Sequence, residues 1–562
     1  MVQRIINLLN KELNSIAQAA FLLAGFTILS QVLGLLRDRS FTHFLGASSG
    51  LDIYYAAFRV PDFIYFSVAS LVSITVLIPF LVKKIDQSDN YQESRKFFND
   101  VFTVFLIAMI GISVLTFFLM PVLAPLIAPG FSETAQKELI NLARIMLLSP
   151  IFLGLSNLIG SITQLFKRFI VFALSPIFYN LGILAGVFFL YPKLGLTGLA
   201  IGVVFGALMH FLIQLPVVAL HKFIPKFSFS IDFGQIKKVA LLSLPRTITL
   251  SLQSFSLIII MAMASLIKEG SVSVFNLSLH LQTAPLAIIG MSYSVAAFPA
   301  LTQFFSKDNQ EAFIHHLTIT ARQIIFWSMP VVFLFIVLRA QIVRVILGSG
   351  EFSWADTRLT AAALAIFSIS VIAQSLRLLF IKSYYATGIT KRPLVISLIS
   401  TSIIIILAYC LLQIFNQNEF FRHFTESLLR VEDISGTAVL MLPLAFSIGA
   451  IVDILLLLFF LKKDLLKNLT IPFINKAFFQ SFSSSFLIGF TAYHFLEIFD
   501  NVFDLNTFWG IFFQGFLSGL IGIIMGILLL WLMKNEELIN ISKTLKTKFW
   551  KARVISPGQE DL

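Results

Sequence analysis

Long apolar runs alternate with short polar connections along most of the chain. About 20 consecutive apolar residues span the hydrocarbon core of a bilayer as one α-helix, so the pattern predicts an all-α polytopic membrane protein with about fourteen transmembrane helices. The first seven are expected near residues 17–37, 53–82, 98–125, 138–165, 170–191, 196–220 and 239–266. The other seven are expected near residues 272–301, 316–346, 358–384, 393–415, 436–461, 474–496 and 508–533.

Charged residues interrupt the first two apolar segments, at Arg37, Asp38, Asp52, Arg59 and Asp62. A charge at the bilayer centre costs roughly 2.5–3.5 kcal/mol on insertion scales, so such residues normally face a polar interior and mark a substrate path. The alternative for Arg37 and Asp38 is an interfacial position at a helix end, from which the arginine reaches the lipid headgroups. This alternative applies less to Arg59, which lies deeper. The cost of inserting these charges predicts that Arg37 and Arg59 face one shared cavity between the halves of the chain.

The composition excludes a soluble globular protein, because only 12% of the residues are charged and 57% are hydrophobic, whereas about 25% charged residues are typical of soluble domains. The formal net charge of +12 does not indicate nucleic-acid binding, since the basic residues lie in short connections between apolar runs. Cys410, the single cysteine, excludes an intramolecular disulfide and a multi-cysteine metal site. We find no metal-ligand cluster, phosphate-binding glycine loop or nucleophile motif, so neither an enzyme nor a cofactor is expected.

The basic residues occupy alternate connections, with groups at Lys83, Lys84, Arg95 and Lys96, at Lys222, Lys226, Lys237 and Lys238, and at Lys462, Lys463, Lys467 and Lys476. Connections rich in lysine and arginine stay in the cytoplasm. Both termini are therefore expected in the cytoplasm, which requires an even number of spans. Residues 416–435 form the longest outward connection, and their periodicity allows a short amphipathic surface helix.

The two halves of the chain resemble each other. PGFSETAQKELINLARIMLLSPI, from Pro129, matches GEFSWADTRLTAAALAIFSISVI, from Gly350, so that Ser132 corresponds to Ser353. Two six-helix lobes related by a pseudo-two-fold axis along the membrane normal would explain this repeat. Transporters built from such repeats bind their substrate between the halves and alternate access by rocking.

These patterns predict an order of domains along the chain. A cytoplasmic N-terminal segment is followed by an N-terminal lobe, a cytoplasmic linker, a C-terminal lobe, two extra helices and a basic cytoplasmic tail, at residues 1–16, 17–221, 222–238, 239–461, 462–533 and 534–562. The two extra helices are rich in glycine. They are either an ordinary packing pair or the walls of a groove for a lipid tail.

The N-terminal segments carry a family resemblance. SQVLGLLRDRSF, then LGASSGLDIYYAAFRVPDF and IPFL, resemble the signature of the MurJ (MviN) lipid II flippases of the multidrug/oligosaccharidyl-lipid/polysaccharide exporter superfamily. The resemblance implies fourteen helices in two lobes around a V-shaped cavity, with a groove for the undecaprenyl tail between the last two helices. It also implies a monomer in the bacterial plasma membrane that moves lipid II to the outer leaflet. Its partners are then lipid II and membrane lipids, not nucleic acid.

Such a protein must carry a diphosphate through an apolar layer, and guanidinium groups bind diphosphate bidentately. By motif position, Arg37 corresponds to the arginine of the family's RD pair and Asp52 to its acidic residue at the start of the second helix. Arg59 occupies a slot that is commonly basic in the family.

Several positions depart from the family pattern. Gln31, Tyr65 and His280 occupy slots that usually hold arginine, and Ser70 occupies an acidic slot. Either the diphosphate is held differently, with Arg59, His280, Gln31, Gln253 and Gln282 as candidates, or the substrate is another lipid-linked glycan.

Two isolated polar residues carry open alternatives. His280 is either a hydrogen-bonded interior residue or a cation that binds the ligand. Asp453 is either an ion-coupling carboxylate or a residue that makes a hydrogen bond between helices. The competing functions are export of another polyprenyl-linked glycan, drug/ion antiport, and a scaffold without transport. Charges that are costly to insert argue against the scaffold.

Overall fold

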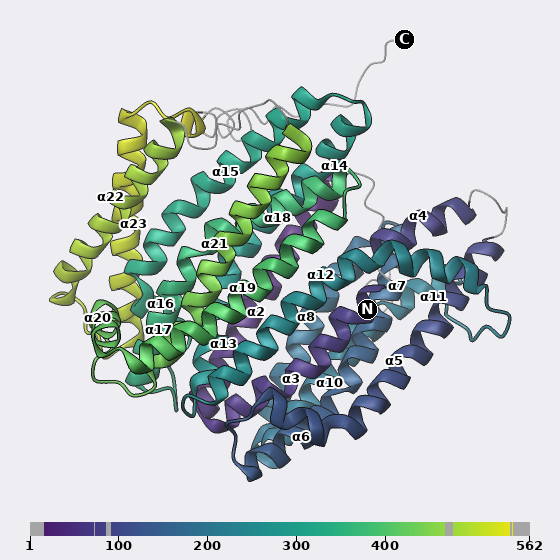
Figure 1. Cartoon of the computed structure of the whole chain (residues 1–562), viewed down its shortest axis with the longest axis horizontal. Coiled ribbons are helices and arrows are strands. Elements are labelled where there is room, and N and C mark those ends of the chain that lie inside the picture. The colour runs from purple at the N-terminus through teal and green to yellow at the C-terminus, as the bar shows by residue number, and fades with distance from the viewer. Residues whose placement is uncertain (1–15, 72–73, 86–90, 467–475, 540–541, 543–562) are drawn as a thin grey trace, which may run out of the picture. The chain divides into compact units, whose positions relative to one another are not determined.

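The computed structural model describes residues 16–71, 74–85, 91–466, 476–539 and 542, and these residues form helices and connections without any strand (Figure 1). The helices up to residue 265 are α2 (Ile16–Leu45), α3 (Ser49–Ser67), η1 (Ala69–Leu71), α4 (Ile74–Ile85), α5 (Gln92–Ile127), α6 (Glu133–Met146), α7 (Leu148–Leu165), α8 (Phe169–Ala185), η2 (Gly186–Leu190), α9 (Tyr191–Leu194), α10 (Leu196–Leu212), α11 (Leu215–Leu220) and α12 (Phe233–Ser265). The later helices are α13 (Ser271–Pro285), η3 (Leu286–Met291), α14 (Ser292–Ser306), α15 (Gln310–Val337), α16 (Arg339–Ile346), α17 (Trp354–Ile369), α18 (Val371–Ala386), α19 (Lys391–Gln417), α20 (Glu419–Leu429), η4 (Thr437–Leu440), α21 (Met441–Leu461), η5 (Lys462–Leu466), α22 (Lys476–Asp500) and α23 (Phe508–Leu532).

Helices occupy every apolar segment that the sequence predicts. Within the described part of the chain, 10 helices are long and apolar enough to cross a membrane, and up to 11 if the pair α17 and α18, bent by 44°, forms one span. Helix α3 is not among them, because its 19 residues carry Asp52, Arg59 and Asp62. The count of fourteen spans stays a prediction.

The described residues group into two compact units that interleave along the chain. Unit 1 contains the described residues within 1–284, 346–370 and 388–460, and unit 2 contains the described residues within 285–345, 371–387 and 461–562. Within unit 1, α3 packs against α6 and α12, and α2 packs against α8. Within unit 2, α22 lies beside α23 and also packs against α15 (Figure 1). The division into two six-helix lobes stays a prediction.

The predicted end of the first helix at residue 37 is wrong. Helix α2 continues for two more turns to Leu45, because the charges that suggested a helix end are bonded inside unit 1. Arg37 binds Asp38, and Arg39 donates to the carbonyl of Ile346 at 3.3 Å. The alternative that Arg37 and Asp38 are interfacial is excluded for Asp38, which is 2% exposed.

The apolar segment predicted near residues 53–82 contains a turn. Helix α3 ends at Ser67, and a 3₁₀ turn separates it from α4. The hydroxyl of Ser67 donates to the carbonyl of Phe63 at 2.5 Å. Such a side-chain bond competes with the backbone bonds that would continue the helix.

The repeated motif forms the same local structure twice. Ser132 caps α6 by accepting from the Ala135 amide at 3.3 Å, and Ser353 caps α17 by accepting from the Asp356 amide at 3.1 Å. At the second site, Asp356 also accepts from the Ser353 amide, which completes a capping box. The resemblance between the sequence halves therefore extends to helix starts.

The amphipathic helix expected in residues 416–435 is confirmed as α20, which exposes Phe420, Phe424 and Leu428 on one side. The connection that follows α20 is held by Arg358. Its guanidinium binds both carboxylate oxygens of Asp433, at 2.7 and 2.8 Å. These hydrogen bonds hold the pKa of the Asp433 carboxyl below its usual range.

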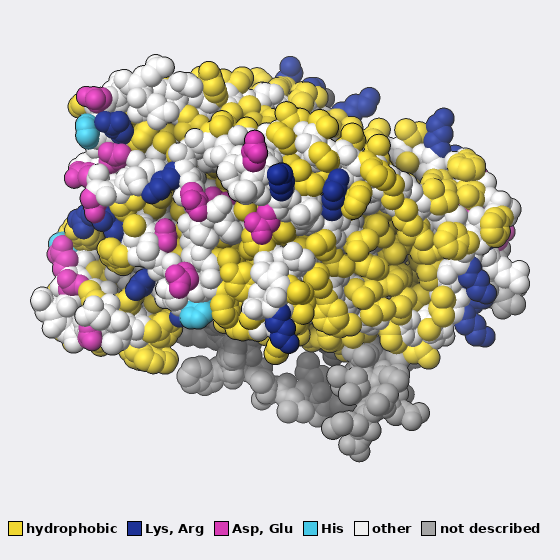
Figure 2. Space-filling view, turned by 90° about the horizontal axis from the view of Figure 1, so that it is seen from below, with side chains coloured by type: hydrophobic (Ala, Val, Ile, Leu, Met, Phe, Trp, Pro, Cys, Tyr) yellow, Lys and Arg dark blue, Asp and Glu magenta, His cyan; other side chains and the backbone are white. Residues whose placement is uncertain are grey.

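Figure 2 shows one face of the molecule on which hydrophobic side chains cover broad areas, with few acidic or basic side chains among them. Among the exposed residues are Phe118 and Leu126 of α5, at 69% and 68%. Soluble proteins rarely expose contiguous apolar patches of this kind. The surface therefore fits a lipid environment.

The glycines of the last two helices serve close packing. A Cβ atom added at any of these six glycines would lie within 4 Å of another residue of unit 2. They are Gly489, Gly510, Gly515, Gly519, Gly522 and Gly526. This is the packing role that the sequence left open. A groove for a lipid tail on another side of the pair stays a proposal.

We expect Gly522→Ala to destabilise the packing of α23 on α22. A Cβ at residue 522 would lie 2.6 Å from the carbonyl oxygen of Ile488, and overpacking costs about 1–3 kcal/mol. That cost exceeds the gain in helix propensity of about 0.8–1 kcal/mol. Thermal unfolding of the purified protein in detergent should show a lower midpoint. Gly111→Ala in α5, where the Cβ meets nothing within 4 Å, is the matched control, and an equal loss in both variants would contradict the packing role.

Candidate functional site

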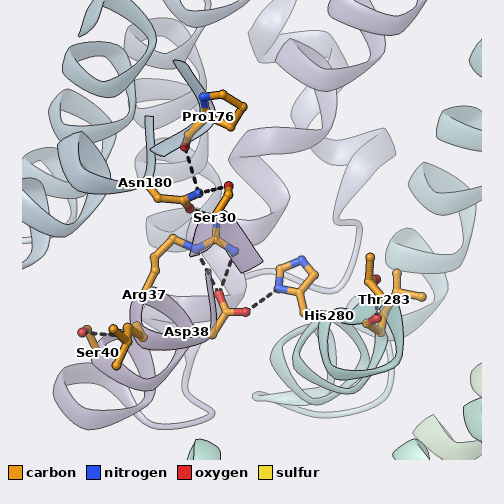
Figure 3. Close-up of polar contacts among 10 residues, drawn as sticks. Ser30, Arg37, Asp38, Ser40, Pro176, Asn180, His280 and Thr283 are labelled. Atoms are coloured by element: carbon orange, nitrogen blue, oxygen red, sulfur yellow. Dashed lines mark hydrogen bonds and ion pairs between the residues drawn. The ribbon is translucent and has the colours of Figure 1, made fainter. Parts of the chain in front are cut away.

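A chain of polar contacts joins three helices of unit 1 (Figure 3). The guanidinium of Arg37 on α2 donates twice to one carboxylate oxygen of Asp38, from Nε at 3.1 Å and from Nη2 at 2.9 Å. The other carboxylate oxygen of Asp38 lies 3.1 Å from Nδ1 of His280 on α13. Nη1 of Arg37 donates to the side-chain oxygen of Asn180 on α8, at 3.3 Å. Arg37 therefore connects α2 to α8, and Asp38 connects α2 to α13.

Asn180 is itself oriented by its neighbours. Its amide nitrogen donates to the hydroxyl of Ser30 at 3.3 Å and to the carbonyl of Pro176 at 3.1 Å (Figure 3). Because both amide protons are bonded, the oxygen of Asn180 points to Arg37. A neutral acceptor thus orients the guanidinium without cancelling its charge.

A second arginine approaches the same region from α3. Nη2 of Arg59 donates to the side-chain oxygen of Asn276 on α13. Asn276 is positioned in turn by its amide nitrogen, which donates to the carbonyl of Val272 at 2.7 Å. The Nε atom of Arg59 is buried without a hydrogen-bond partner. A buried donor without a partner is costly, so an acceptor that reached this atom would remove that cost.

Both arginines line one cavity of about 210 Å³. Its lining comes from α2, α3, α8 and α13 and consists of Arg37, Phe41, Tyr54, Tyr55, Phe58, Arg59, Asp62, Tyr179, Asn276 and His280. On α3, Tyr55, Arg59 and Asp62 follow one another at spacings of four and three, which places them on one helix face. The ring of Tyr55 meets the ring of His280 edge-on, with 5.7 Å between centroids. The cavity is aromatic in its walls and charged at three positions of its lining.

Asp52 lies outside this cavity, in a reciprocal contact between the starts of α3 and α13. One of its carboxylate oxygens accepts from the Gly270 amide at 2.7 Å. The other accepts from the amide of Ser273 at 2.7 Å and from its hydroxyl at 2.5 Å. In return, Glu269 accepts from the Ser49 amide at 2.9 Å. Carboxylates are favoured at helix N-termini by the free amides and the helix dipole. We call this contact, formed by Ser49, Asp52, Glu269, Gly270 and Ser273, the α3–α13 clasp.

The clasp depends on close backbone approach. Gly270 has a φ of +86°, and a Cβ there would lie 2.3 Å from the carbonyl oxygen of Ala47. Beside the clasp, Gly350 has a φ of +57° and its Cβ would lie 2.1 Å from the carbonyl oxygen of His43. Only glycine combines a left-handed conformation with such proximity at no steric cost. The end of α2 and the turn that follows it are therefore in close backbone contact with Gly350 and with Gly270.

The structure brings together three of the predicted site residues, Arg37, Arg59 and His280. It places the glutamines elsewhere: Gln282 donates to the carbonyl of Phe367 at 3.0 Å and to the hydroxyl of Ser370 at 2.8 Å, while Gln253 is exposed. Gln31 is half-buried on α2 and does not line the cavity. Asp453 is buried on α21, away from the cavity lining.

Sequence reasoning named the charges of Asp38 and Asp62 but did not assign them to the site, and it missed the asparagines and tyrosines. Asn180 and Asn276 were detectable as amides in otherwise apolar helices. Tyr54, Tyr55 and Tyr179 gave no separate signal, because tyrosine is common in membrane helices. Tyr65, at a slot that is usually arginine, accepts from Nδ2 of Asn157 at 2.7 Å.

A larger cavity of about 660 Å³ lies elsewhere in unit 1, beside α20. Two of its lining residues have acidic neighbours, since His423 lies 3.9 Å from Glu426 and Arg422 lies 4.0 Å from Glu419. Arg37 and Arg59 are in the smaller cavity, and the unpartnered donor is there too. The smaller cavity is therefore the candidate site.

Known protein sequences resemble this chain over most of its length. The family described as "Lipid II flippase MurJ" matches residues 41–514. A protein of Rickettsia prowazekii named "Probable lipid II flippase MurJ" is 27% identical over 387 residues, which cover 68% of this chain and 76% of that protein. A protein of Burkholderia cenocepacia named "Lipid II flippase MurJ" is 25% identical over 397 residues, covering 68% and 75%.

Solved structures share the fold. One titled "Lipid II flippase MurJ, inward closed conformation" superimposes with a TM-score of 0.70 at 22% identity, covering 94% of this chain and 100% of that chain. A multidrug resistance MATE family transporter in an inward-facing conformation superimposes with a TM-score of 0.61 at 16% identity, covering 78% and 96%. The chain thus has the architecture found in both proteins.

Proposed function

The chain belongs to the lipid II flippase MurJ family, and we propose that it moves lipid II from the inner to the outer leaflet of the bacterial inner membrane. The observation that carries this proposal is the cavity in which Arg37 and Arg59 meet between apolar helices. A lipid-linked diphosphate needs such a cavity, because its charge is expensive to move through hydrocarbon.

In this proposal the arginines receive the diphosphate. Arg59 offers its unpartnered Nε, and Arg37 is kept in place by Asp38 and Asn180. Charge-assisted hydrogen bonds from guanidinium to phosphate are about twice as strong as neutral ones. His280 stands where the family usually has arginine, and its Nδ1 contacts Asp38. No step of this process makes or breaks a covalent bond, so the protein acts as a transporter.

The finer architecture belongs to the same proposal. Fourteen spans would form two six-helix lobes, and the two last helices would guide the polyprenyl tail. The protein would work as a monomer by alternating access, with Asp453 as a candidate for ion coupling. The α3–α13 clasp would lie at the outer side, because a cytoplasmic N-terminus places the turn after α2 outside. Its release would then open the cavity outward.

Orientation can be tested with single cysteines in a Cys410→Ser background. Because the connection after α20 is proposed to face outward, an impermeant thiol reagent should label Glu432→Cys in intact cells. Asp308→Cys, in the connection between α14 and α15, should react only after the cells are permeabilised. Both side chains are exposed in the structure, so burial does not explain a missing reaction. Labelling in the opposite order would overturn the proposed orientation.

The function itself is tested by depleting a bacterial host of its own lipid II flippase. Expression of this chain should restore growth, and Arg59→Ala should not. Failure to restore growth, despite normal amounts of protein in the membrane, would favour another polyprenyl-linked glycan as substrate. That second substrate class stays an alternative because three positions that are usually basic in the family are occupied by Gln31, Tyr65 and His280.

A further inference from the structure

The connection between α11 and α12 exposes aromatic and basic side chains together. Phe227 is 60% exposed and Phe229 is 99% exposed, and Phe233, the first residue of α12, is 67% exposed. The only acidic residue in this stretch of sequence is Asp232. Four exposed lysines accompany the phenylalanines, at Lys222, Lys226, Lys237 and Lys238. We call these three phenylalanines and four lysines the aromatic–basic patch.

Contacts with α5 hold the connection in a defined place. Two side chains of α5, one helical turn apart, accept from its backbone. Asn99 accepts from the Lys226 amide at 2.9 Å, and Thr103 accepts from the Ser228 amide at 2.9 Å. The ring of Phe227 also lies 5.9 Å, between centroids, from the ring of Phe102 on α5. The exposed phenylalanines therefore belong to an anchored segment.

The start of the connection is anchored by an aromatic cluster. Phe223 is 2% exposed, and its ring lies 6.1 Å from the ring of Phe98 and 5.6 Å from the ring of Phe166, between centroids. The guanidinium carbon of Arg95 lies 5.6 Å from the centroid of the Phe223 ring. Lys222 has a φ of +59°, which is uncommon for a residue other than glycine. This turn buries Phe223 and leaves Lys222 at the surface.

The patch lies at the level where the surface of α5 changes from polar to apolar. Lys96 is exposed, and Ile107, farther along α5, is 59% exposed. Asn99 and Thr103, which hold the connection, lie between these two residues. The connection also joins two helical stretches that are long and apolar enough to cross a membrane. Aromatic and basic side chains at such a level are typical of contacts with lipid headgroups.

We propose that the aromatic–basic patch docks on the acidic phospholipids of the surrounding membrane. Four lysines and one aspartate make the stretch complementary to an anionic surface, and each lysine near such a surface strengthens binding roughly fivefold. The phenylalanines insert between the lipids, where a ring leaves water without burying a polar group. This contact does not depend on which substrate the protein moves.

The test places a fluorophore at the most exposed residue of the patch. Phe229→Cys in a Cys410→Ser background carries a bimane group, and the purified full-length protein is placed in phosphatidylcholine nanodiscs with a small fraction of nitroxide-labelled lipid. We expect labelled phosphatidylglycerol to quench the bimane at least about fivefold more strongly than labelled phosphatidylcholine at the same mole fraction. This excess should shrink as salt is added, because salt screens interactions between exposed charges.

Two variants test whether the lysines cause the excess. Lys222→Gln combined with Lys226→Gln should reduce it several-fold and leave the quenching that both lipids share, which reports the insertion of the phenylalanines. Lys307→Gln removes an exposed lysine from the connection between α14 and α15 and should keep the full excess. The salt dependence needs no lysine variant, so it holds even if the double variant folds poorly.

Several outcomes overturn the inference. Equal quenching by both lipids does so, as does an excess that salt leaves unchanged. Absence of quenching by either lipid also overturns it: emission as in water shows a solvated segment, and blue-shifted emission assigns the patch to a second copy of the chain. Loss of the excess on addition of stoichiometric lipid II assigns the patch to the substrate instead. Quenching in the absence of lipid II does not measure transport, so the proposed function is tested separately.

Discussion

Arg37→Ala should reduce translocation of short-chain lipid II in proteoliposomes to the rate seen without protein. Arg37 contacts Asp38 through two hydrogen bonds and reaches Asn180 with a third. In the proposed complex Arg37→Ala also removes a hydrogen bond to a charged phosphate, which contributes about 1.5–3 kcal/mol and corresponds to a loss of affinity of roughly 10- to 150-fold. Arg37→Lys should recover little, because a point charge cannot serve Asp38, Asn180 and a phosphate at once.

This prediction needs a control for folding. Arg37→Ala leaves the Asp38 carboxylate, in a residue only 2% exposed, with His280 as its remaining partner. An uncompensated buried charge costs about 3–5 kcal/mol of stability. The double variant Arg37→Ala with Asp38→Asn removes that charge and should restore expression and monodispersity without restoring transport. Normal transport by the double variant would show that Arg37 only neutralises Asp38.

The shared cavity of Arg37 and Arg59 was predictable, because the argument rests on the free-energy cost of inserting a charge into a membrane, whereas His280 was a candidate only through its position in the family pattern. Charges in apolar helices must find polar surroundings, whatever the details of the fold. The glutamines were not predictable in this way. A glutamine amide can face a cavity or donate to a backbone carbonyl, and the sequence does not distinguish the two. Gln282 donates to the carbonyl of Phe367.

The helix boundaries show where the pattern is ambiguous. A cluster such as Arg37 to Arg39 looks the same in sequence whether it meets lipid headgroups or partners inside the protein. Here its partners are distant in the chain, at Asn180, His280 and Ile346. Only the folded structure brings these residues together, so α2 was expected to end two turns too early.

The role of Asp52 shows a similar limit. The family resemblance marked it as part of the substrate site, whereas its carboxylate accepts three hydrogen bonds at the start of α13. Sequence alone does not tell that the N-termini of α3 and α13 meet. The reciprocal bond from Ser49 to Glu269 is invisible for the same reason.

Gly270→Ala should open the α3–α13 clasp and abolish transport. The new methyl group would lie 2.3 Å from the backbone carbonyl of Ala47, which has no flexible side chain to yield. Overpacking of this kind costs about 1–3 kcal/mol, which raises the population with an open clasp roughly 5- to 150-fold. A cysteine at Leu51, a fully buried position on α3, reports the opening. In a Cys410→Ser background, an impermeant reagent should label Leu51→Cys much faster when Gly270→Ala is also present.

The matched control separates backbone strain from the lost contact. Gly388 also has a positive φ, +76°, but a Cβ there meets nothing within 4 Å. Gly388→Ala therefore carries the conformational cost of a left-handed alanine without pushing two segments apart. It should leave the labelling of Leu51→Cys unchanged and retain transport. If both alanine variants accelerate labelling equally, local strain rather than the clasp controls access. If Gly270→Ala transports normally, the contact between Asp52 and α13 is a structural cap and not the closure that alternating access must break.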